Sequence, residues 1–460
     1  MKRSVLFSFI KEFELPFKVP TPDKTISVAV TGMSRSGKTV FLTSFINQLL
    51  ANDKLNYLNE KLQRPFTARL LPPDSHYSRF DYFSKLRAFR EKNPTWPKAT
   101  KQVSKTTLQL EFKSEYAFLA NQIINIELID YPGEWLLDLS MLELDFDAWS
   151  RQMITLAKEP KREDFSDEWL KMIDGLDLYG AYHDSTKDEE VFDMYCEYLK
   201  TLHYNHLSFV QPGRFLEPGD MDGDPLLHFS PLPLIVSKEE IHPNSLYARF
   251  EKRYNGYKEE VVRRLYVEHF KYFDTQIILV DLVKTLQHGQ DSFSDMHLAF
   301  KHILKSFTYG HNNFLTKLFG LKIDHVIFAA TKADYIPPPQ HNSYKRLLEE
   351  MIWDLKNELD VGHTDTEVTV FSAVKCTEYV KAEYQGEILE CVKGIVEGED
   401  EPSVHYPGLL PKNYKDEKFW QENIFDFPLF KPIVFPKSDS ESVAHIRMDR
   451  VIYSILRNKV

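Results

Sequence analysis

Short runs of apolar and β-branched residues alternate with helical patterns at both ends of the chain. Six of these runs have the length of a strand, at 26–30, 107–112, 123–129, 276–281, 325–330 and 367–371. The continuous apolar run VIFAA, within the fifth, is typical of a strand that is buried on both faces of a sheet. Strands and helices that alternate in this way predict an α/β domain with a mostly parallel sheet flanked by helices.

One long stretch between the third and fourth predicted strands does not follow this alternation. Residues 136–274 are polar, rich in Asp, Glu, Lys and Tyr, and mostly helical in pattern. Helical segments at 188–203 and 258–273 lie on either side of a loop rich in turn residues at 211–225, QPGRFLEPGDMDGDP. We therefore predict a large, mainly helical insertion in the α/β core.

The predicted organisation is a core that the insertion divides in two. We expect 1–135 to form the first part of the core, 136–274 the insertion, and 275–460 the second part of the core. Within the second part, short alternating strands and an acidic, Pro-containing loop predict a small β insertion at about 375–435. Apolar residues at nearly helical spacing predict an amphipathic helix over 441–457.

The composition is that of a globular protein. Hydrophobic residues make up 43% of the 460 positions and charged residues 27%, which excludes a wholly disordered or fibrous chain. The net charge is −11, whereas a protein that coats nucleic acid leans basic, so we expect no nucleic-acid partner. A small anionic ligand is compatible with this charge, because a local backbone pocket can bind it.

Cysteine and histidine spacing gives no metal signature. Cys196, Cys376 and Cys391 lie far apart without a CxxC pair, which indicates a reducing compartment and argues against a disulfide framework. His203 and His206 have no second pair nearby, so we expect ordinary histidines rather than metal ligands.

No apolar run reaches the ~20 residues that a membrane-spanning helix needs. Residues 1–14 resemble a signal peptide only briefly, because the apolar stretch at 5–10 is short and no small-residue cleavage site follows. We expect an N-terminal helix packed on the domain, with a membrane-touching amphipathic helix as the minor alternative. The expected location is cytoplasmic.

The strongest chemical signal follows the first predicted strand. Residues 32–39 read GMSRSGKT, match G-x-x-x-x-G-K-[ST] and precede the helical run FLTSFINQLL. Glycines let backbone N–H groups face phosphates, Lys38 can reach the β- and γ-phosphates, and Thr39 can offer a hydroxyl to Mg²⁺. The predicted nucleotide contacts in this loop are Gly32, Ser34, Arg35, Ser36, Gly37, Lys38, Thr39 and Val40.

The second signal, LIDYPGE, ends the third predicted strand. Asp130 is a natural carboxylate for Mg²⁺ at a P-loop site, and Gly133 completes D-x-x-G, where a glycine lets the backbone approach the γ-phosphate. Glu134 follows directly. Its carboxylate can orient the attacking water, repel the γ-phosphate, or only cap a helix.

Two arginines are candidates for a cation on the transferred phosphate. Arg35, inside the loop, can act like an arginine finger, and a surface or interdomain salt bridge is the alternative. Arg214, in QPGRFLEPGD, is a weaker candidate whose default role is loop packing. The candidate catalytic residues are Glu134, Gly133, Lys38 and Arg35.

A hydroxyl from the first switch is expected to complete the magnesium site. Thr106 and Thr107 lie just before the second predicted strand, which is the expected place, and Ser104 is an alternative. The predicted magnesium ligands are Thr39, Asp130 and Thr106.

Two strings after later strands point to guanine. TKAD follows the fifth strand and resembles [NT]-K-x-D, in which Asp334 can accept hydrogen bonds from the N1–H and exocyclic amine of guanine. Adenine lacks that donor pair, and the Lys332 stem can cover the base. Ser372, Ala373 and Val374 follow the last strand and resemble the S-A-K loop, with Val374 in place of lysine. The four signals in this order favour GTP over ATP.

The strings GMSRSGKTVF, LIDYPGEW, QPGRFLEPGD, TKAD and HIRMDR together resemble the YcjX family of bacterial stress-associated P-loop GTPases, over essentially the whole chain. The resemblance implies a Ras-like core with a helical insertion, GTP binding and hydrolysis, a cytoplasmic location and association with heat-shock or envelope stress. It also implies a link to an inner-membrane protein of the YcjF type, and so a peripheral place at that membrane.

The sequence therefore predicts a Mg²⁺-dependent GTPase that hydrolyses GTP to GDP and acts as a nucleotide-controlled switch. Two alternatives stay open. One is a non-catalytic guanine-nucleotide-dependent interaction module, in which Glu134 is no catalyst. The other is a P-loop kinase, although a kinase has no need of TKAD and SAV after two later strands.

Overall fold

The computed structural model describes residues 23–32, 36–73, 78–97, 103–114, 120–181, 186–268, 273–308, 325–359, 365–457 and 459. The expected N-terminal helix lies outside these residues, and so do Ser34 and Arg35 of the phosphate loop.

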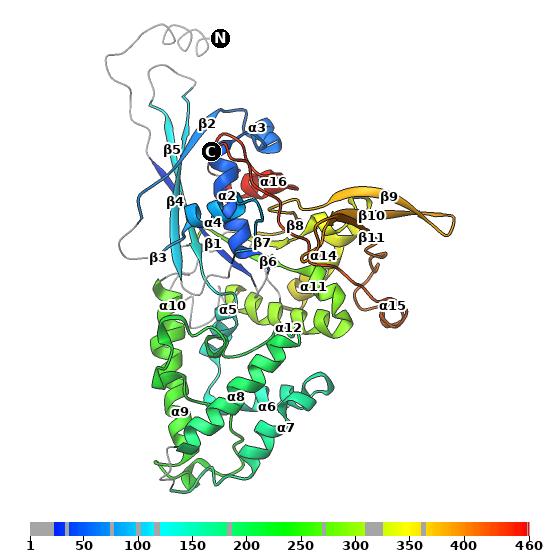
Figure 1. Ribbon diagram of the computed structural model, residues 1–460. Coiled ribbons are helices and arrows are strands. Elements are labelled where there is room, and N and C mark those ends of the chain that lie inside the picture. The colour runs from blue at the N-terminus through cyan, green and yellow to red at the C-terminus, as the bar shows by residue number, and fades with distance from the viewer. Residues whose placement is uncertain are drawn as a thin grey trace.

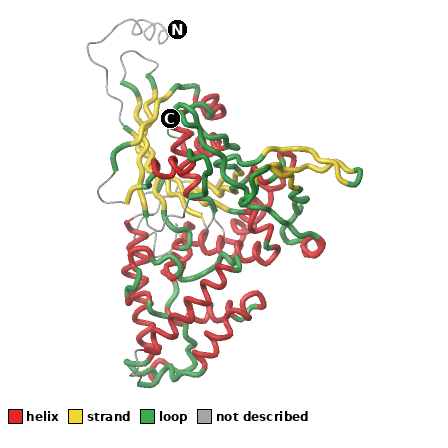
Figure 2. Tube along the Cα trace, in the orientation of Figure 1, coloured by secondary structure: helices red, strands yellow, loops and turns green. Residues whose placement is uncertain are grey.

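An eight-stranded sheet forms the centre of the core (Figure 1; Figure 2). Its order is β2-β4-β5-β1-β6-β7-β8, and β3 pairs with β4. Its strands are β1 (Lys24–Gly32), β2 (Phe66–Leu70), β3 (Ser78–Arg79), β4 (Ser104–Phe112), β5 (Gln122–Asp130), β6 (Thr275–Val280), β7 (His325–Ala330) and β8 (Asp365–Val370). The strands from β5 to β8 along this order are parallel, whereas β4 is antiparallel to β2 and β5.

All six predicted strands are confirmed, and so is the mostly parallel α/β fold. Every residue of β6 and β7 is buried, as a continuous apolar run at the centre of a parallel sheet requires. The prediction missed β2 and β3, because FTARL and the two-residue β3 carry too few apolar residues to stand out.

Helices cover both faces of the sheet. One face packs against α2 (Lys38–Ala51), α4 (Tyr82–Phe89) and α16 (Met448–Leu456), with α3 (Asn56–Leu62) beside α16. The other face packs against α11 (Leu282–Gln287), α12 (Gly289–Thr308) and α14 (His341–Leu359). The carboxyl ends of the central strands thus open between two helical layers, where ligands of such sheets commonly bind.

The chain between β5 and β6 is mainly helical and forms the lower part of the molecule in Figure 1. Its helices are α5 (Trp135–Asp138), α6 (Phe146–Ala157), α7 (Pro160–Asp174), α8 (Thr186–Tyr204), α9 (Leu246–Gly256) and α10 (Arg263–Glu268). The segment predicted as a helix at 258–273 begins as a π-helix, Tyr257–Val262, before α10. The loop at 211–225 holds short 3₁₀ turns at Gly213–Phe215, Gly219–Met221 and Pro225–Leu227.

A buried ion pair joins this helical part to the core. The guanidinium of Arg162, on α7, pairs with Asp295 on α12, and both side chains are buried. Asp295 also accepts a hydrogen bond from the backbone N–H of Phe209 at 2.7 Å. Since a buried charge without its partner is costly, this contact favours one docked arrangement of the helices on the core.

A three-stranded antiparallel sheet, formed late in the chain, projects from the core to the right in Figure 1. Its strands are β9 (Glu378–Tyr384), β10 (Glu387–Ile395) and β11 (Pro402–His405), followed by the short helix α15 (Glu417–Glu422). The short alternating strands predicted after 375 are confirmed, but the acidic loop predicted after them contains β11.

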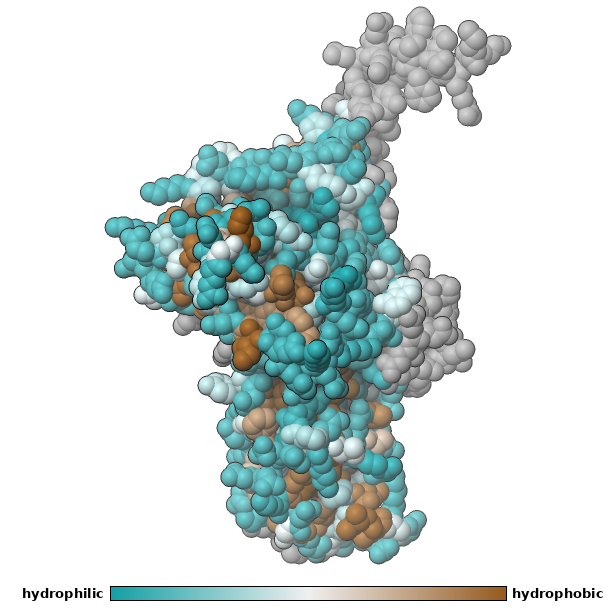
Figure 3. Space-filling view, turned by 90° about the vertical axis from the view of Figure 1, so that its right-hand side faces the viewer, coloured by the Kyte–Doolittle hydropathy of each residue, from teal (hydrophilic) through white to brown (hydrophobic). Residues whose placement is uncertain are grey.

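No described helix is both long and apolar enough to cross a membrane. The face of the molecule in Figure 3 is mainly hydrophilic, with apolar side chains in small separate groups.

Candidate functional site

The phosphate loop joins the end of β1 to the start of α2. Gly37 takes the N-cap position with a φ of 87°, a left-handed conformation that favours glycine. A Cβ on Gly32 would lie 2.2 Å from the Ser36 hydroxyl and 2.9 Å from the Leu279 carbonyl oxygen. The turn therefore needs both glycines, and it presents the N-terminus of α2 to the ligand side.

Lys38 and Asp130 form an ion pair at the carboxyl ends of neighbouring strands. The Lys38 Nζ lies 3.0 Å from Asp130 Oδ1 and donates a hydrogen bond to the Tyr131 carbonyl at 2.5 Å. Asp130 ends β5 opposite Val30 of β1, and Thr39 is buried in the first turn of α2. The predicted lysine, threonine and aspartate therefore come together at one edge of the sheet.

The register of β4 against β5 separates the candidate hydroxyls of the first switch. Ser104 lies directly opposite Asp130, whereas Thr106 lies opposite Leu128 and Thr107 opposite Glu127. Directly opposite residues share a face, so Ser104 and Thr106 are on the face of Asp130 and Thr107 is on the other. The hydroxyls of Ser104 and Thr106 are buried without a hydrogen-bond partner among the described residues.

One cavity of about 480 Å³ is lined by most of the residues predicted to bind a nucleotide. From the phosphate loop these are Gly32, Ser36, Gly37, Lys38, Thr39 and Val40, from the later strings Lys332, Asp334, Ser372, Ala373 and Val374, and from the second signal Glu134. The volume is that of an ordinary ligand pocket. The Ser36 hydroxyl is buried and has no partner among the described residues, which is the sign of a group that awaits a ligand.

The Asp334 carboxylate is held rigidly at the base end of this cavity. Its Oδ1 accepts from the Ser372 hydroxyl at 2.5 Å and its Oδ2 from the Cys376 backbone N–H at 2.8 Å. Burial raises the pKa of Asp334, while these hydrogen bonds act in the opposite direction. Each oxygen keeps a further lone pair, so the oriented carboxylate can still accept from a ligand.

Lys332 takes a left-handed conformation, with a φ of 57°, at the start of the turn that carries Asp334. Its Nζ lies 2.6 Å from Asp281 Oδ2 and 5.8 Å from the centre of the Tyr335 ring. Asp281 also caps α11, since its Oδ1 accepts from the Lys284 backbone N–H at 3.1 Å. The sequence predicts Asp281 only as the last residue of a strand. Its place in the cavity wall is not predicted.

Aromatic, proline and leucine residues that no motif marks form another wall of the same cavity. They are Trp96, Pro97, Phe427, Pro428 and Leu429. The Trp96 indole N–H donates to the Phe430 carbonyl at 2.9 Å, which joins the two segments. Trp96 and Phe430 lie 334 positions apart in the chain, and both segments lie between elements, so no local pattern could have indicated them.

Residues before α16 hold the Ser372 loop onto α2. Ser372 and Ile446 exchange two backbone hydrogen bonds of 2.9 Å, and the Gln48 side chain on α2 donates to the Val443 carbonyl at 2.6 Å. These backbone contacts keep the segment extended, so the helix predicted over 441–457 begins only at Met448. The string HIRMDR thus supports the base end of the cavity.

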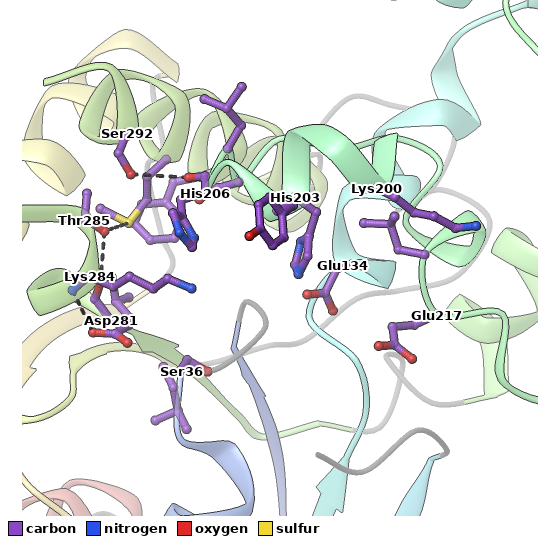
Figure 4. A pocket seen from close by; sticks show the side chains of 18 residues that line it. Ser36, Glu134, Lys200, His203, His206, Glu217, Asp281, Lys284, Thr285 and Ser292 are labelled. Atoms are coloured by element: carbon purple, nitrogen blue, oxygen red, sulfur yellow. Dashed lines mark hydrogen bonds between the residues drawn. The ribbon is translucent and has the colours of Figure 1, made fainter. Parts of the chain in front are cut away.

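Glu134 starts α5 and is buried between the core and the helical insertion. It occupies the N-cap position, but its side chain makes no capping hydrogen bond, so the helix-cap interpretation is wrong. A Cβ on Gly213 would lie 2.2 Å from the Glu134 carbonyl oxygen, which explains the glycine in QPGRF. Glu134 lines the large cavity and a second cavity of about 280 Å³ between the core and α8 (Figure 4).

Arg214 is engaged in loop packing. Its guanidinium lies 3.4 Å from the centre of the Trp135 ring and donates to Asp220 Oδ1 at 3.0 Å and to the Pro218 carbonyl at 3.1 Å. This is the default role that the sequence indicated for Arg214, and it leaves the guanidinium outside the residues that line the two cavities.

Asp138, at the end of α5, is the polar centre of the contact between α5 and this loop. It accepts hydrogen bonds from the Tyr257 hydroxyl at 2.5 Å and from the backbone N–H groups of Gly213 and Arg214 at 2.7 and 3.3 Å. Burial raises the pKa of Asp138 to about 6, although the hydrogen bonds and the Arg214 charge oppose the shift. The residues after the D-x-x-G string are thus joined to the helical insertion.

The sheet, the phosphate loop between β1 and α2, and the strings that follow β5, β7 and β8 define a Ras-like α/β P-loop core with a helical insertion. A model of the YcjX-like family, DUF463, matches residues 26–460, and the chain belongs to this family.

Two relatives are similar over nearly their whole length. The chain is 34% identical over 454 residues to the Ras-like GTPase YcjX of Escherichia coli, which covers 95% of this chain and 96% of that protein. It is 30% identical over 470 residues to the Ras-like GTPase YcjX of Shewanella oneidensis, which covers 96% of both chains.

Proposed function

We propose that this protein binds GTP and hydrolyses it to GDP and phosphate in the presence of Mg²⁺. The observation that carries the proposal is the single cavity with a phosphate loop at one end and the oriented Asp334 carboxylate at the other. The name of the two relatives, Ras-like GTPase, supports the same function.

The phosphate end acts through backbone N–H groups and one mobile cation. The N-terminus of α2 and the turn at Gly37 attract the phosphates, and Lys38 moves its ammonium from Asp130 to phosphate oxygens. Asp130 would still have a positive partner after this exchange, because its carboxylate would then face the metal. Ser36 is placed to donate its unpartnered hydroxyl to a phosphate.

The residues at this edge fit a magnesium ion. Thr39 supplies a hydroxyl and Asp130 a carboxylate, and Ser104, opposite Asp130, is better placed than Thr106 to supply the first-switch hydroxyl. No group of three or more His, Cys, Asp or Glu in the described part of the chain could hold a metal, so water and phosphate oxygens would have to complete its ligands. When bound, Mg²⁺ neutralises charge on the phosphate oxygens.

The base end selects guanine. Asp334 accepts from the N1–H and the exocyclic amine, and Ser372 and Cys376 hold its carboxylate in that orientation. The backbone of Ala373 and Val374 lies beside it at the cavity wall, where an N–H can meet the base oxygen. The Lys332 stem covers the base while its ammonium stays on Asp281.

Hydrolysis requires an oriented water beside the γ-phosphate. The Gly133 N–H binds a γ-phosphate oxygen, and the Glu134 carboxylate orients the water. Arg35, which lies outside the described residues, is the candidate cation in the loop. Catalysis by positioning and charge alone is consistent with slow intrinsic turnover.

The nucleotide acts as a switch in a bacterial stress response, read by a partner at the inner membrane from the cytoplasmic side. The proposed core consists of 1–135 and 275–460, with a small β insertion at about 375–435. The helical insertion, 136–274, is the part through which the partner reads the switch. Because Asp138 and Trp135 join α5 to the 211–225 loop, a change at Glu134 reaches the insertion.

Calorimetric titration with GTP, GDP and ATP, followed by single-turnover hydrolysis, tests the proposal. Tight binding of GTP and GDP but not ATP is expected, with hydrolysis that Glu134→Ala slows about 10²-fold at nearly unchanged affinity. Preference for ATP would refute the guanine assignment. Binding without hydrolysis would leave the non-catalytic interaction module as the function.

A further inference from the structure

The second cavity joins the phosphate end of the core to the helical insertion (Figure 4). Ser36 and Glu134 belong to the core side of its wall, and Lys200 and His203 on α8 belong to the insertion. Since Ser36 and Glu134 also line the large cavity, the two cavities meet where the γ-phosphate would lie. Residues of α8 therefore approach the reacting end of the nucleotide.

Figure 4 shows the His203 imidazole and the Glu134 carboxylate pointing toward each other into this cavity. Glu134 is only 4% exposed, so its charge is poorly screened by water. A carboxylate at this place repels a γ-phosphate unless a cation lies beside it. An imidazolium on the opposite wall supplies such a cation.

The position of His203 is held by contacts at the end of α8. Asp295 on α12 accepts from the backbone N–H of Phe209 at 2.7 Å and pairs with Arg162 of α7. The chain that follows α8 is thus joined to the core a few residues after His203. This docking places the α8 wall of the cavity opposite Glu134.

We propose that His203 is a positioning residue for GTP hydrolysis. Its imidazolium pairs with the Glu134 carboxylate, turns that carboxylate toward the attacking water and offsets its repulsion of the γ-phosphate. The inference rests on the proposed GTPase function. It makes hydrolysis depend on the docking of the helical insertion, because the imidazole comes from α8.

Other charged groups face the same cavity from each element around it. They are Lys200 on α8, His206 after α8, Glu217 in the 211–225 loop, and Asp281 and Lys284 at the start of α11. Asp281 pairs with Lys332, and Figure 4 shows Lys284 and His206 on the side of the cavity away from Glu134. Figure 4 shows Lys200 and Glu217 on the same side of the cavity as Glu134, and His203 as the imidazole that faces the Glu134 carboxylate.

His203→Gln tests the proposal through hydrolysis and its pH dependence. The wild-type single-turnover rate is expected to fall as the pH rises and the His203 imidazolium loses its proton. The variant is expected to be about 10-fold slower at pH 6 and to lose this pH dependence, with GDP affinity within about twofold of wild type and GTP affinity lowered relative to GDP, because the repulsion of the γ-phosphate is no longer offset. His242→Gln, an exposed histidine near the start of α9, is the matched control and should keep the wild-type rate.

A double-mutant cycle shows whether His203 acts through Glu134. In a Glu134→Gln protein there is no carboxylate charge to offset, so adding His203→Gln should change the rate less than about twofold. Equal slowing in both backgrounds, or a wild-type rate and pH profile in His203→Gln, would overturn the proposal. If the wild-type protein itself neither binds nor hydrolyses GTP, the proposed function fails, and this is visible before any variant is compared.

Discussion

The Lys38 ammonium lies 3.0 Å from the Asp130 carboxylate, and the side chains are 12% and 2% exposed respectively. The pair joins the first turn of α2 to the end of β5. It also places the cation that should bind phosphate next to the carboxylate that should face the metal, so each charge has a partner before the nucleotide arrives.

Lys38→Ala should abolish tight GTP binding and also destabilise the nucleotide-free protein. Without Lys38, the buried Asp130 carboxylate loses this ion pair, which should lower the free energy of unfolding by about 3 kcal/mol. Urea unfolding and calorimetric GTP titration measure the two effects. Thr39→Ala is the control, because it removes a proposed metal ligand but leaves the ion pair, so affinity should fall without that loss of stability. Unchanged GTP affinity in Lys38→Ala would contradict the assignment of the loop.

Ser104→Ala should weaken the magnesium dependence of GTP binding, whereas Thr106→Ala should leave it nearly intact. Ser104 is opposite Asp130 and Thr106 is two residues farther along β4, opposite Leu128. The measurement is GTP affinity as a function of Mg²⁺ concentration, with GDP in parallel. The reverse order of effects would show that Thr106 is the metal-binding hydroxyl.

Asp334→Asn should shift the nucleotide preference from GTP toward xanthosine triphosphate. The amide can donate to the C2 oxygen of xanthine, which a carboxylate would repel. Ser372→Ala is the control: it removes one hydrogen bond to Asp334, so GTP binding should weaken about 10-fold with no gain for xanthosine. Competition titrations with the two triphosphates distinguish the variants, and an unaltered guanosine preference in Asp334→Asn would mean that another group reads the base.

Asp138 should make the folded protein more stable in mild acid than at neutral pH. Its pKa is raised to about 6 in the folded protein, above the ordinary 3.8, so between these values the folded state holds more protons than the unfolded state. Stability from this group is therefore present below pH 4 and is lost as the pH rises to about 6, by up to about 3 kcal/mol.

Asp138→Asn should remove this dependence, as urea unfolding at a series of pH values between 4 and 7.5 would measure. Asp220→Asn is the control, because that carboxylate belongs to the same loop but is exposed, and it should change stability by less than about 1 kcal/mol. Parallel pH profiles for wild type and Asp138→Asn would show that Asp138 does not titrate in this range.

The central strands and the phosphate loop could be predicted from local sequence. A buried parallel strand is a continuous apolar run, and GMSRSGKT needs only its own backbone and the helix that follows to face an anion. The same holds for TKAD and SAV, because each directly follows a strand of the same parallel sheet.

Several features depended on how distant segments meet. The β4–β5 register, which places Ser104 and not Thr106 opposite Asp130, could not be read from the sequence of one strand. The late start of α16 follows from backbone hydrogen bonds to Ser372, which compete with helix formation before Met448.

The sequence by itself determined which chemical groups follow which strands, because strand patterns and phosphate-loop chemistry are local properties of the chain. Only the tertiary structure decided what surrounds those groups: Trp96 hydrogen-bonded to Phe430, Asp281 paired with Lys332, and His203 of α8 facing Glu134. These partners come from segments far apart in the chain. Their meeting is set by the docking of helices and loops on the sheet, which no local pattern in the sequence specifies.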